Sequence, residues 1–164
     1  MNIFFLDKDP KLAAQYHCDK HVVKMILESA QLLSTAWYIH CPQSSAERNL
    51  YKPTHANHPC SLWTRKTQGN YKWLWELAAA LCQEYTYRYG KIHASQQMIE
   101  KLVWCPRAII PFGLLDPVQC MPDEYKQADG VQAYRNYYIN DKAAILSYKK
   151  REVPEWLPLL KVAA

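Results

Sequence analysis

Apolar side chains recur at three- and four-residue intervals along much of the chain, which is the spacing of an α-helix. The clearest case begins at Asp9 and Pro10, where Asp is a favourable N-cap and Pro a favourable first helical residue. We therefore predict a long helix over residues 10–38, either continuous or broken near residues 16–21. This helix has to end before Pro42, because proline does not fit inside a helix.

Prolines, glycines and capping residues divide the rest of the chain. Residues 2–6 form a short apolar run, which predicts either a buried strand or an extended lead-in. Beyond the first helix we expect, in order, a loop over 41–58, a helix with Pro59 in its first turn, a break or kink at Gly69 and Asn70, a long helix over 71–89 that Gly90 ends, a short helix from Ser95 to Trp104, an irregular loop over 106–122 and a last helix over 130–149 capped by Asp129.

Composition favours the same fold class. The chain has 164 residues, which suits one domain, and only 4 glycines, which argues against a sandwich or a barrel. Long stretches are rich in Ala, Leu, Lys, Glu and Gln, the residues with high helix propensity. The sequence thus predicts an all-α protein, a compact helical bundle with long irregular loops that forms a single domain over residues 1–164.

Charge and hydropathy limit the partners and the location. The formal net charge of +5 mildly favours an anionic partner, a nucleotide or a nucleic acid. No apolar run approaches the roughly 20 residues needed to cross a bilayer, and charge appears too early in the chain for a secretory signal. We therefore expect a cytoplasmic protein that does not bind membranes. The oligomeric state is open.

Six cysteines are spread along the chain without any CxxC pair: Cys18, Cys41, Cys60, Cys82, Cys105 and Cys120. In a cytoplasmic protein this predicts reduced, mostly buried thiols and no disulfide framework. Two histidine pairs, His17/His21 and His55/His58, have spacings that suit a metal. No HExxH motif, neighbouring His-Asp pair or cysteine pair accompanies them, so we expect neither a metal nor another cofactor.

Polar side chains form a narrow row on one side of the first predicted helix, which is otherwise almost entirely apolar. If the helix is continuous, the row consists of His17, His21, Lys24, Glu28, Gln31 and Thr35. A helix that is apolar on most sides is buried on most sides, so the row faces either water or a polar cavity. Its mixture of imidazole, amine and carboxylate favours a functional cavity, in which His17, His21, Lys24 and Glu28 are the candidate catalytic residues.

Two further groups predict contacts with a nucleotide or nucleic acid. The first lies in the loop and helix after residue 51 and offers hydrogen-bond donors to a phosphate: Lys52, Thr54, His55, Asn57, His58 and Arg65. The second combines basic and aromatic side chains near the ends of the later helices: Arg88, Lys91, His93, Tyr125 and Arg135. For both groups the alternative is an ordinary structural role, as loop caps in the first group and as packing or surface residues in the second.

Three motifs carry a resemblance to known proteins. The segments 16–24 (YHCDKHVVK), 54–59 (THANHP) and 84–90 (EYTYRYG) resemble a family of small, largely uncharacterised bacteriophage proteins. In layout, the chain is also similar to the phage pyrimidine-dimer DNA glycosylases of the endonuclease V type, which are small and all-helical. That resemblance implies base excision through a Schiff base, in which an amine attacks the sugar and a carboxylate assists.

The resemblance does not carry over at two positions. The family's nucleophile is an amino-terminal amine exposed by removal of Met before a small residue, whereas Asn2 follows Met1 here. The position of the family's carboxylate falls near Val23 and Lys24, and Glu28 is the nearest carboxylate in the sequence.

Three hypotheses follow. The first is an enzyme that cleaves or exchanges an N-glycosidic bond in a nucleotide or nucleic acid. In it Lys24 or the Met1 amine is the nucleophile, Glu28 is the general base, and the sugar-phosphate is held by His17, His21, His55 and His58. The second is a non-catalytic phage module that captures a nucleotide or a host partner. The third is a metal-dependent phosphohydrolase that uses the four histidines.

Overall fold

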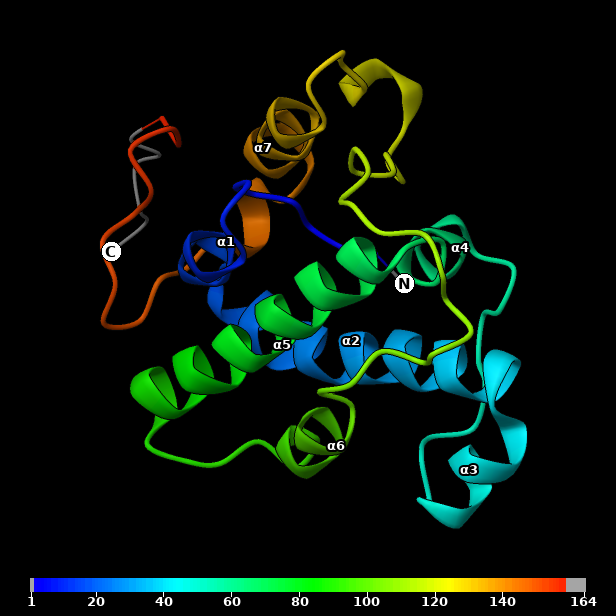
Figure 1. Ribbon diagram of the computed structural model, residues 1–164. Helices are drawn as coiled ribbons and strands as arrows, with labels where there is room; N and C mark the ends of the chain where they lie inside the picture. Colours follow the sequence, from blue (N-terminus) through cyan, green and yellow to red (C-terminus); the bar gives the residue numbers. More distant parts are fainter. Residues whose placement is uncertain (1, 159–164) are drawn as a thin grey trace.

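The computed structural model describes residues 2–158, and these fold into an all-helical structure (Figure 1). No strand occurs within this range. The α-helices are α1 (Pro10–Tyr16), α2 (Asp19–His40), α3 (Pro42–Glu47), α4 (Pro59–Thr64), α5 (Gln68–Tyr89), α6 (Gln96–Lys101) and α7 (Gly130–Asp141), and two 3₁₀ helices, η1 (Asp123–Tyr125) and η2 (Ala143–Ile145), flank α7. The all-α prediction is confirmed.

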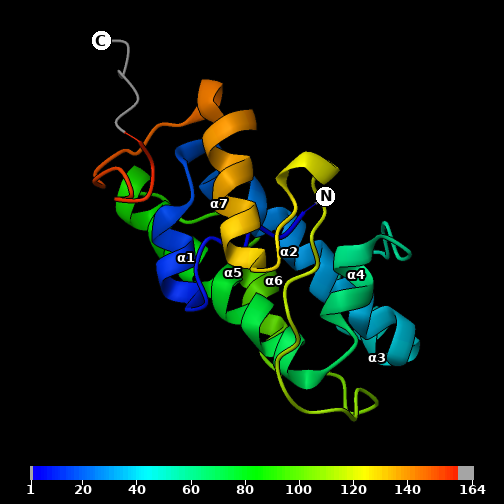
Figure 2. The ribbon, with the colours of Figure 1, turned by 90° about the horizontal axis from the view of Figure 1, so that it is seen from above.

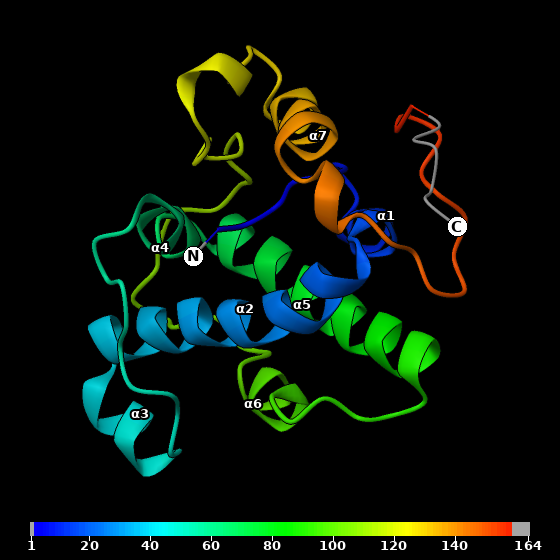
Figure 3. The ribbon, with the colours of Figure 1, turned by 180° about the vertical axis from the view of Figure 1, so that it is seen from behind.

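The first predicted helix is broken. Asp9 caps α1 by accepting a hydrogen bond from Lys11 N at 2.8 Å, as expected. His17 and Cys18 then adopt extended backbone conformations, with ψ of 131° and 161°, before α2 begins. α1 and α2 therefore point in different directions (Figure 3), and residues before and after the break do not share one helical face.

The central packing is between α2, α5 and α1. α5 crosses α2 and also packs on α1 (Figures 1 and 3). Thr67 caps α5, with its hydroxyl accepting from Asn70 N at 3.1 Å, and Gly90 ends it with a φ of 66°. Of the two alternatives at Gly69 and Asn70, the break is wrong, because both residues lie inside the first turn of α5.

Residues 3–6 form an extended lead-in rather than a strand. All four side chains, from Ile3 to Leu6, are buried in the core. Phe5 stacks on Trp73 of α5 at 4.5 Å, and Phe4 contacts Tyr138 of α7. The start of the described chain thus lies beside α2 and α4 and underneath α7 (Figure 2).

One helix was not predicted, and two others end earlier than the sequence predicts. The predicted 41–58 loop contains α3, which Pro42 begins. α6 ends at Lys101, before Trp104. α7 ends at Asp141 instead of Lys149, since its last turn carries Asn140 and Asp141, which have low helix propensity.

The irregular segment 106–122 runs from α6 towards α7 and passes the start of α5 and α4 (Figure 2). Thr67 Oγ1 donates to Gly113 O at 2.6 Å, and Trp63 Nε1 donates to Asp116 O at 2.8 Å. A side chain at Gly69 would overlap the Gly113 carbonyl, so glycine is required at this crossing. The segment is thereby held against α4.

All six cysteines are free, with Cys18, Cys60 and Cys82 buried and the other three half-buried. Within residues 2–158 no helix combines the length and the apolar character that crossing a membrane requires.

Candidate functional site

The polar row on the first predicted helix is divided by the break before α2. His17 follows α1 and is not part of α2, so the single face that included it was a wrong prediction. Along α2 the remaining members differ in exposure: His21 and Thr35 are buried, whereas the Lys24 side chain is 67% exposed and that of Glu28 12% exposed. The row therefore runs from the core at His21 to the surface at Lys24.

His17 and His21 are core residues. His17 Nδ1–H donates to the Ala13 carbonyl at 2.6 Å, and His21 Nδ1 lies 2.5 Å from the Tyr138 hydroxyl. Phe4 stacks on His21 with ring centroids 4.3 Å apart. Burial lowers the pKa of His17 to about 4 and that of His21 to about 3, so both rings are neutral near pH 7. Buried in this way, they do not reach a sugar-phosphate, and we correct their predicted role.

Lys24 and Glu28 form an ion pair within the row. Lys24 Nζ lies 3.3 Å from Glu28 Oε1, one helical turn away on α2. The other carboxylate oxygen, Oε2, accepts a hydrogen bond from Asn2 N at 3.1 Å. An exposed amine and a largely covered carboxylate thus meet beside the start of the described chain. Met1, whose amine is the alternative nucleophile, lies outside the described residues.

Asn2, which the sequence analysis did not select, is held from several directions. Its side-chain Nδ2 donates to Cys120 O at 3.0 Å, and its Oδ1 accepts from the Tyr134 hydroxyl at 2.9 Å. Tyr134 is fully buried in α7. These contacts link the 106–122 segment and α7 to the backbone amide that holds Glu28. No local sequence pattern signals them, because the partners lie 118 and 132 positions away.

The loop over residues 54–58 reaches the same side of α2. Thr54 N donates to Thr35 Oγ1 at 3.2 Å, and the Thr35 hydroxyl donates to Thr54 O at 3.3 Å. Arg65 of the segment after α4 holds the loop by donating to Ala56 O at 2.7 Å. The polar row and this loop, which we predicted to act together, therefore do meet through Thr35.

The 54–58 loop presents polar and ionisable groups to solvent. His55 and Asn57 are exposed, and Lys52 just before them is exposed as well. His58 is half-buried, and its pKa is lowered by burial and by the neighbouring His55, so its ring is neutral near pH 7. His58 Nδ1 accepts from Cys60 N at 3.2 Å, which puts the ring proton on Nε2.

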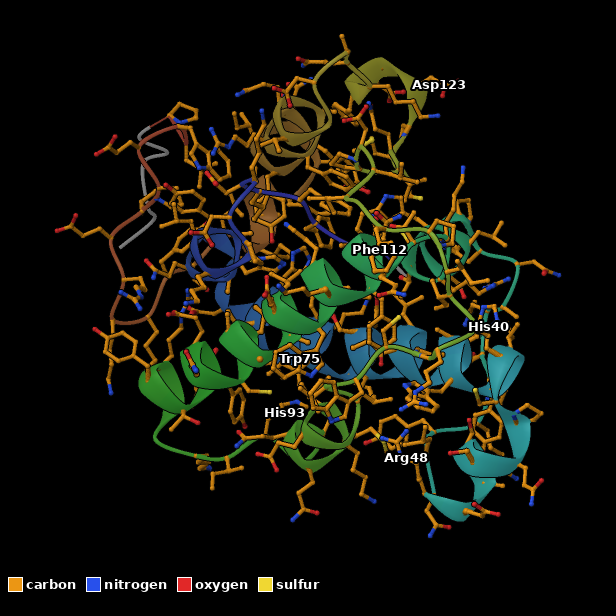
Figure 4. All side chains as sticks on the ribbon, viewed as in Figure 1. His40, Arg48, Trp75, His93, Phe112 and Asp123 are labelled. Atoms are coloured by element: carbon orange, nitrogen blue, oxygen red, sulfur yellow. The ribbon has the colours of Figure 1, made fainter. Side chains whose placement is uncertain are left out.

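The second predicted group does not gather at this site. Arg88 is fully buried and paired with Asp19 at 3.0 Å and Glu84 at 3.1 Å, so its predicted phosphate contact is corrected to a structural role. Arg135 donates to Leu6 O and pairs with Asp7 at 2.9 Å. Lys91 and His93 follow the end of α5, and Figure 4 places His93 next to α6. Tyr125 ends η1 and packs on Tyr137.

We expected a cavity beside the polar row, but a large cavity of the structure lies elsewhere. A hollow of about 580 Å³ is lined by the N-terminal segment, Trp73 and residues 114–117 and 128–131, and it includes no member of the row. Lys24 and Glu28 instead lie on an open face of α2.

The four histidines do not come together either. His17 and His21 are in the core, whereas His58 groups with Cys60 and Cys120. Within residues 2–158, this group is the one in which three metal-ligating side chains approach one another. The phosphohydrolase hypothesis, which needed all four histidines, therefore loses its basis.

Comparison with known proteins places the chain in a family. A family model described as pyrimidine dimer DNA glycosylase matches residues 1–98, which is more than half of the chain and includes α1 to α5, the 54–58 loop, Lys24 and Glu28. No curated protein and no solved structure matches the chain. The chain belongs to the pyrimidine dimer DNA glycosylase family, and the resemblance seen in the sequence is confirmed.

Proposed function

We propose that this protein is a DNA glycosylase that removes damaged pyrimidines, with Lys24 as the nucleophile and Glu28 as the general acid–base. The observation that carries the proposal is the Lys24–Glu28 pair at 3.3 Å on an open face of α2. The family supplies the class of reaction, and this pair supplies the amine and the carboxylate which that reaction uses.

The chemistry can be written with these two groups. Glu28 accepts a proton from the Lys24 ammonium, and the free amine attacks C1′ of the deoxyribose. The C1′–N bond breaks, and the departing base keeps the electron pair and takes a proton. The amine nitrogen then loses its second proton as the C1′–O4′ bond opens, which leaves a Schiff base between Lys24 and the sugar and a hydroxyl at C4′. Water releases the enzyme from this intermediate.

The surroundings of Glu28 support this role. Its side chain is only 12% exposed and its Oε2 is held by Asn2 N, so the carboxylate keeps one position. Lys24, at 67% exposed, is free to swing towards a sugar that has been turned out of the helix. Glu28 thus stays in place while Lys24 moves.

The DNA strand would lie along the 54–58 loop. His55, Asn57 and Lys52 are exposed and supply hydrogen-bond donors or positive charge, which suits a phosphate backbone. Thr35 ties this loop to α2, so a phosphate bound there is on the same side of the molecule as Lys24. This gives the 54–58 loop a binding role and no part in bond cleavage.

The test is base release from an ultraviolet-irradiated oligonucleotide. Lys24→Ala and Glu28→Gln should each lower the rate at least 100-fold, as expected when a nucleophile or its acid–base partner is removed. A matched pair exists on α5, where Lys72 and Glu76 form the same i, i+4 contact at 3.7 Å. Lys72→Ala and Glu76→Gln should leave the rate within about twofold of the wild type.

Equal activity of the Glu28→Gln variant and the wild type would contradict the proposed role of the carboxylate. Absence of any release by the wild-type protein, in the presence of tight and specific binding to irradiated DNA, would favour the non-catalytic module instead.

A further inference from the structure

Three side chains that could bind a metal converge between α4 and the 106–122 segment. His58 and Cys60 lie at the start of α4, and Cys120 lies near the end of the segment. One ligand atom from each, an imidazole nitrogen and two sulfurs, lies within 4.8 Å of the others. The two sulfurs are 3.5 Å apart although the residues are 60 positions apart in the chain.

We propose that His58, Cys60 and Cys120 bind a zinc ion. Tetrahedral zinc with Zn–S bonds of about 2.3 Å places two coordinated sulfurs about 3.8 Å apart. The observed separation of 3.5 Å needs only a small adjustment to reach that value. An imidazole and two thiolates are ligands that zinc prefers, and three protein ligands leave one tetrahedral position for water or for an atom of a bound molecule.

A metal ion would take the place of the hydrogen bonds that the three residues now make with one another. His58 Nδ1 accepts a hydrogen bond from Cys60 N, and coordination of a metal by this nitrogen would replace that hydrogen bond. Cys60 Sγ donates to Cys120 Sγ, and coordination of both sulfurs by one ion would replace this hydrogen bond. Binding of Zn²⁺ releases the two thiol protons and forms two Zn–S bonds.

The proposed ion would connect the parts of the molecule that hold Asn2. Cys60 Sγ lies 3.7 Å from Asn2 Oδ1, and Cys120 O accepts from Asn2 Nδ2 at 3.0 Å. Zinc would therefore fix α4 and the 106–122 segment around Asn2, whose backbone amide holds Glu28. The metal site has a positioning role in this scheme, and its existence does not depend on the proposed glycosylase reaction.

The site is tested by measuring metal content. The protein is purified under reducing conditions, loaded with ZnCl₂, desalted, and analysed by elemental and native mass spectrometry. We expect about one zinc per chain, lost in Cys60→Ser and Cys120→Ser and strongly reduced in His58→Ala. Cys82→Ser is the matched control, because Cys82 is buried in α5 outside the cluster, and it should keep the metal.

Cobalt gives a second readout that does not depend on activity. Co²⁺ added to the metal-free protein should produce thiolate charge-transfer bands and the intense visible bands of tetrahedral coordination. Removal of zinc by a chelator should lower the Tm of the wild type but not that of Cys120→Ser. This comparison stays valid even if one variant folds poorly, because each protein is compared with itself.

Two outcomes would overturn the proposal. One is that the protein retains no zinc after treatment with ZnCl₂ and shows no cobalt bands. The other is a chain lighter by about 2 Da with Cys60 linked to Cys120, since the pair would then be a disulfide. Both are independent of base release, so a failed metal site and a failed glycosylase assignment can be told apart.

Discussion

At the scale of single residues, the buried neutral imidazoles of His17 and His21 make the stability of the folded protein depend on pH. An unfolded histidine has a pKa near 6.5, whereas these two have values of about 4 and about 3 in the folded protein. As the pH falls below 6.5 the unfolded chain binds protons that the folded protein does not, so stability falls. The stability that the two neutral rings contribute is fully present above pH 6.5. It is lost progressively as the pH falls towards the folded pKa values of about 4 and about 3.

We predict that each of these histidines lowers the free energy of unfolding by roughly 2 kcal/mol between pH 7.5 and pH 5. Urea unfolding at a series of pH values measures this slope. His17→Gln and His21→Gln should each flatten it by about one proton, while His55→Gln, at an exposed position, should not. An unchanged slope in both core variants would show that the two rings are not the groups that titrate.

Among the elements, Arg88 joins α5 to α1, to α2 and to the residues between them. From the last turn of α5 its guanidinium donates to the carbonyls of Gln15 in α1 and His17 before α2, each at 2.9 Å. It also pairs with Asp19 at the start of α2 and with Glu84, which in turn pairs with Arg151. The break between α1 and α2 is therefore fixed by one buried side chain from α5.

Arg88→Met should destabilise the protein by about 3–5 kcal/mol, because it leaves the half-buried carboxylate of Asp19 without its cation and the buried carboxylate of Glu84 with Arg151 alone. Thermal or urea unfolding measures the loss, and Arg107→Ala, at an exposed position, is the control. A loss below about 1 kcal/mol would mean that the network adds little to the packing of α1, α2 and α5.

For the whole molecule, local signals in the sequence predicted the main helices but not the contacts around the candidate site. Asp9, Gly90 and Asp129 act as caps where they were expected, since a cap depends only on its near neighbours. His17 was assigned to the wrong face because the helical period was continued across a break that Arg88, far along the chain, stabilises.

The residues around Glu28 show the same limit. Lys24 and Glu28 were found because they lie one turn apart on a helix. The contact of Asn2 with Glu28 and that of Cys60 with Cys120 span 26 and 60 positions, and they depend on the packing of the 106–122 segment. A pattern of spacing within one helix carries no information on such contacts.

The central claim is that Lys24 and Glu28 form a base-excision site, and borohydride trapping tests it most directly. The protein is mixed with irradiated DNA and borohydride, which reduces a Schiff base to a stable amine, and the crosslinked peptide is identified by mass spectrometry. We predict a covalent protein–DNA adduct on Lys24 that is absent in Lys24→Ala and much reduced in Glu28→Gln. An adduct on any other amine, or base release without an adduct, would contradict this account.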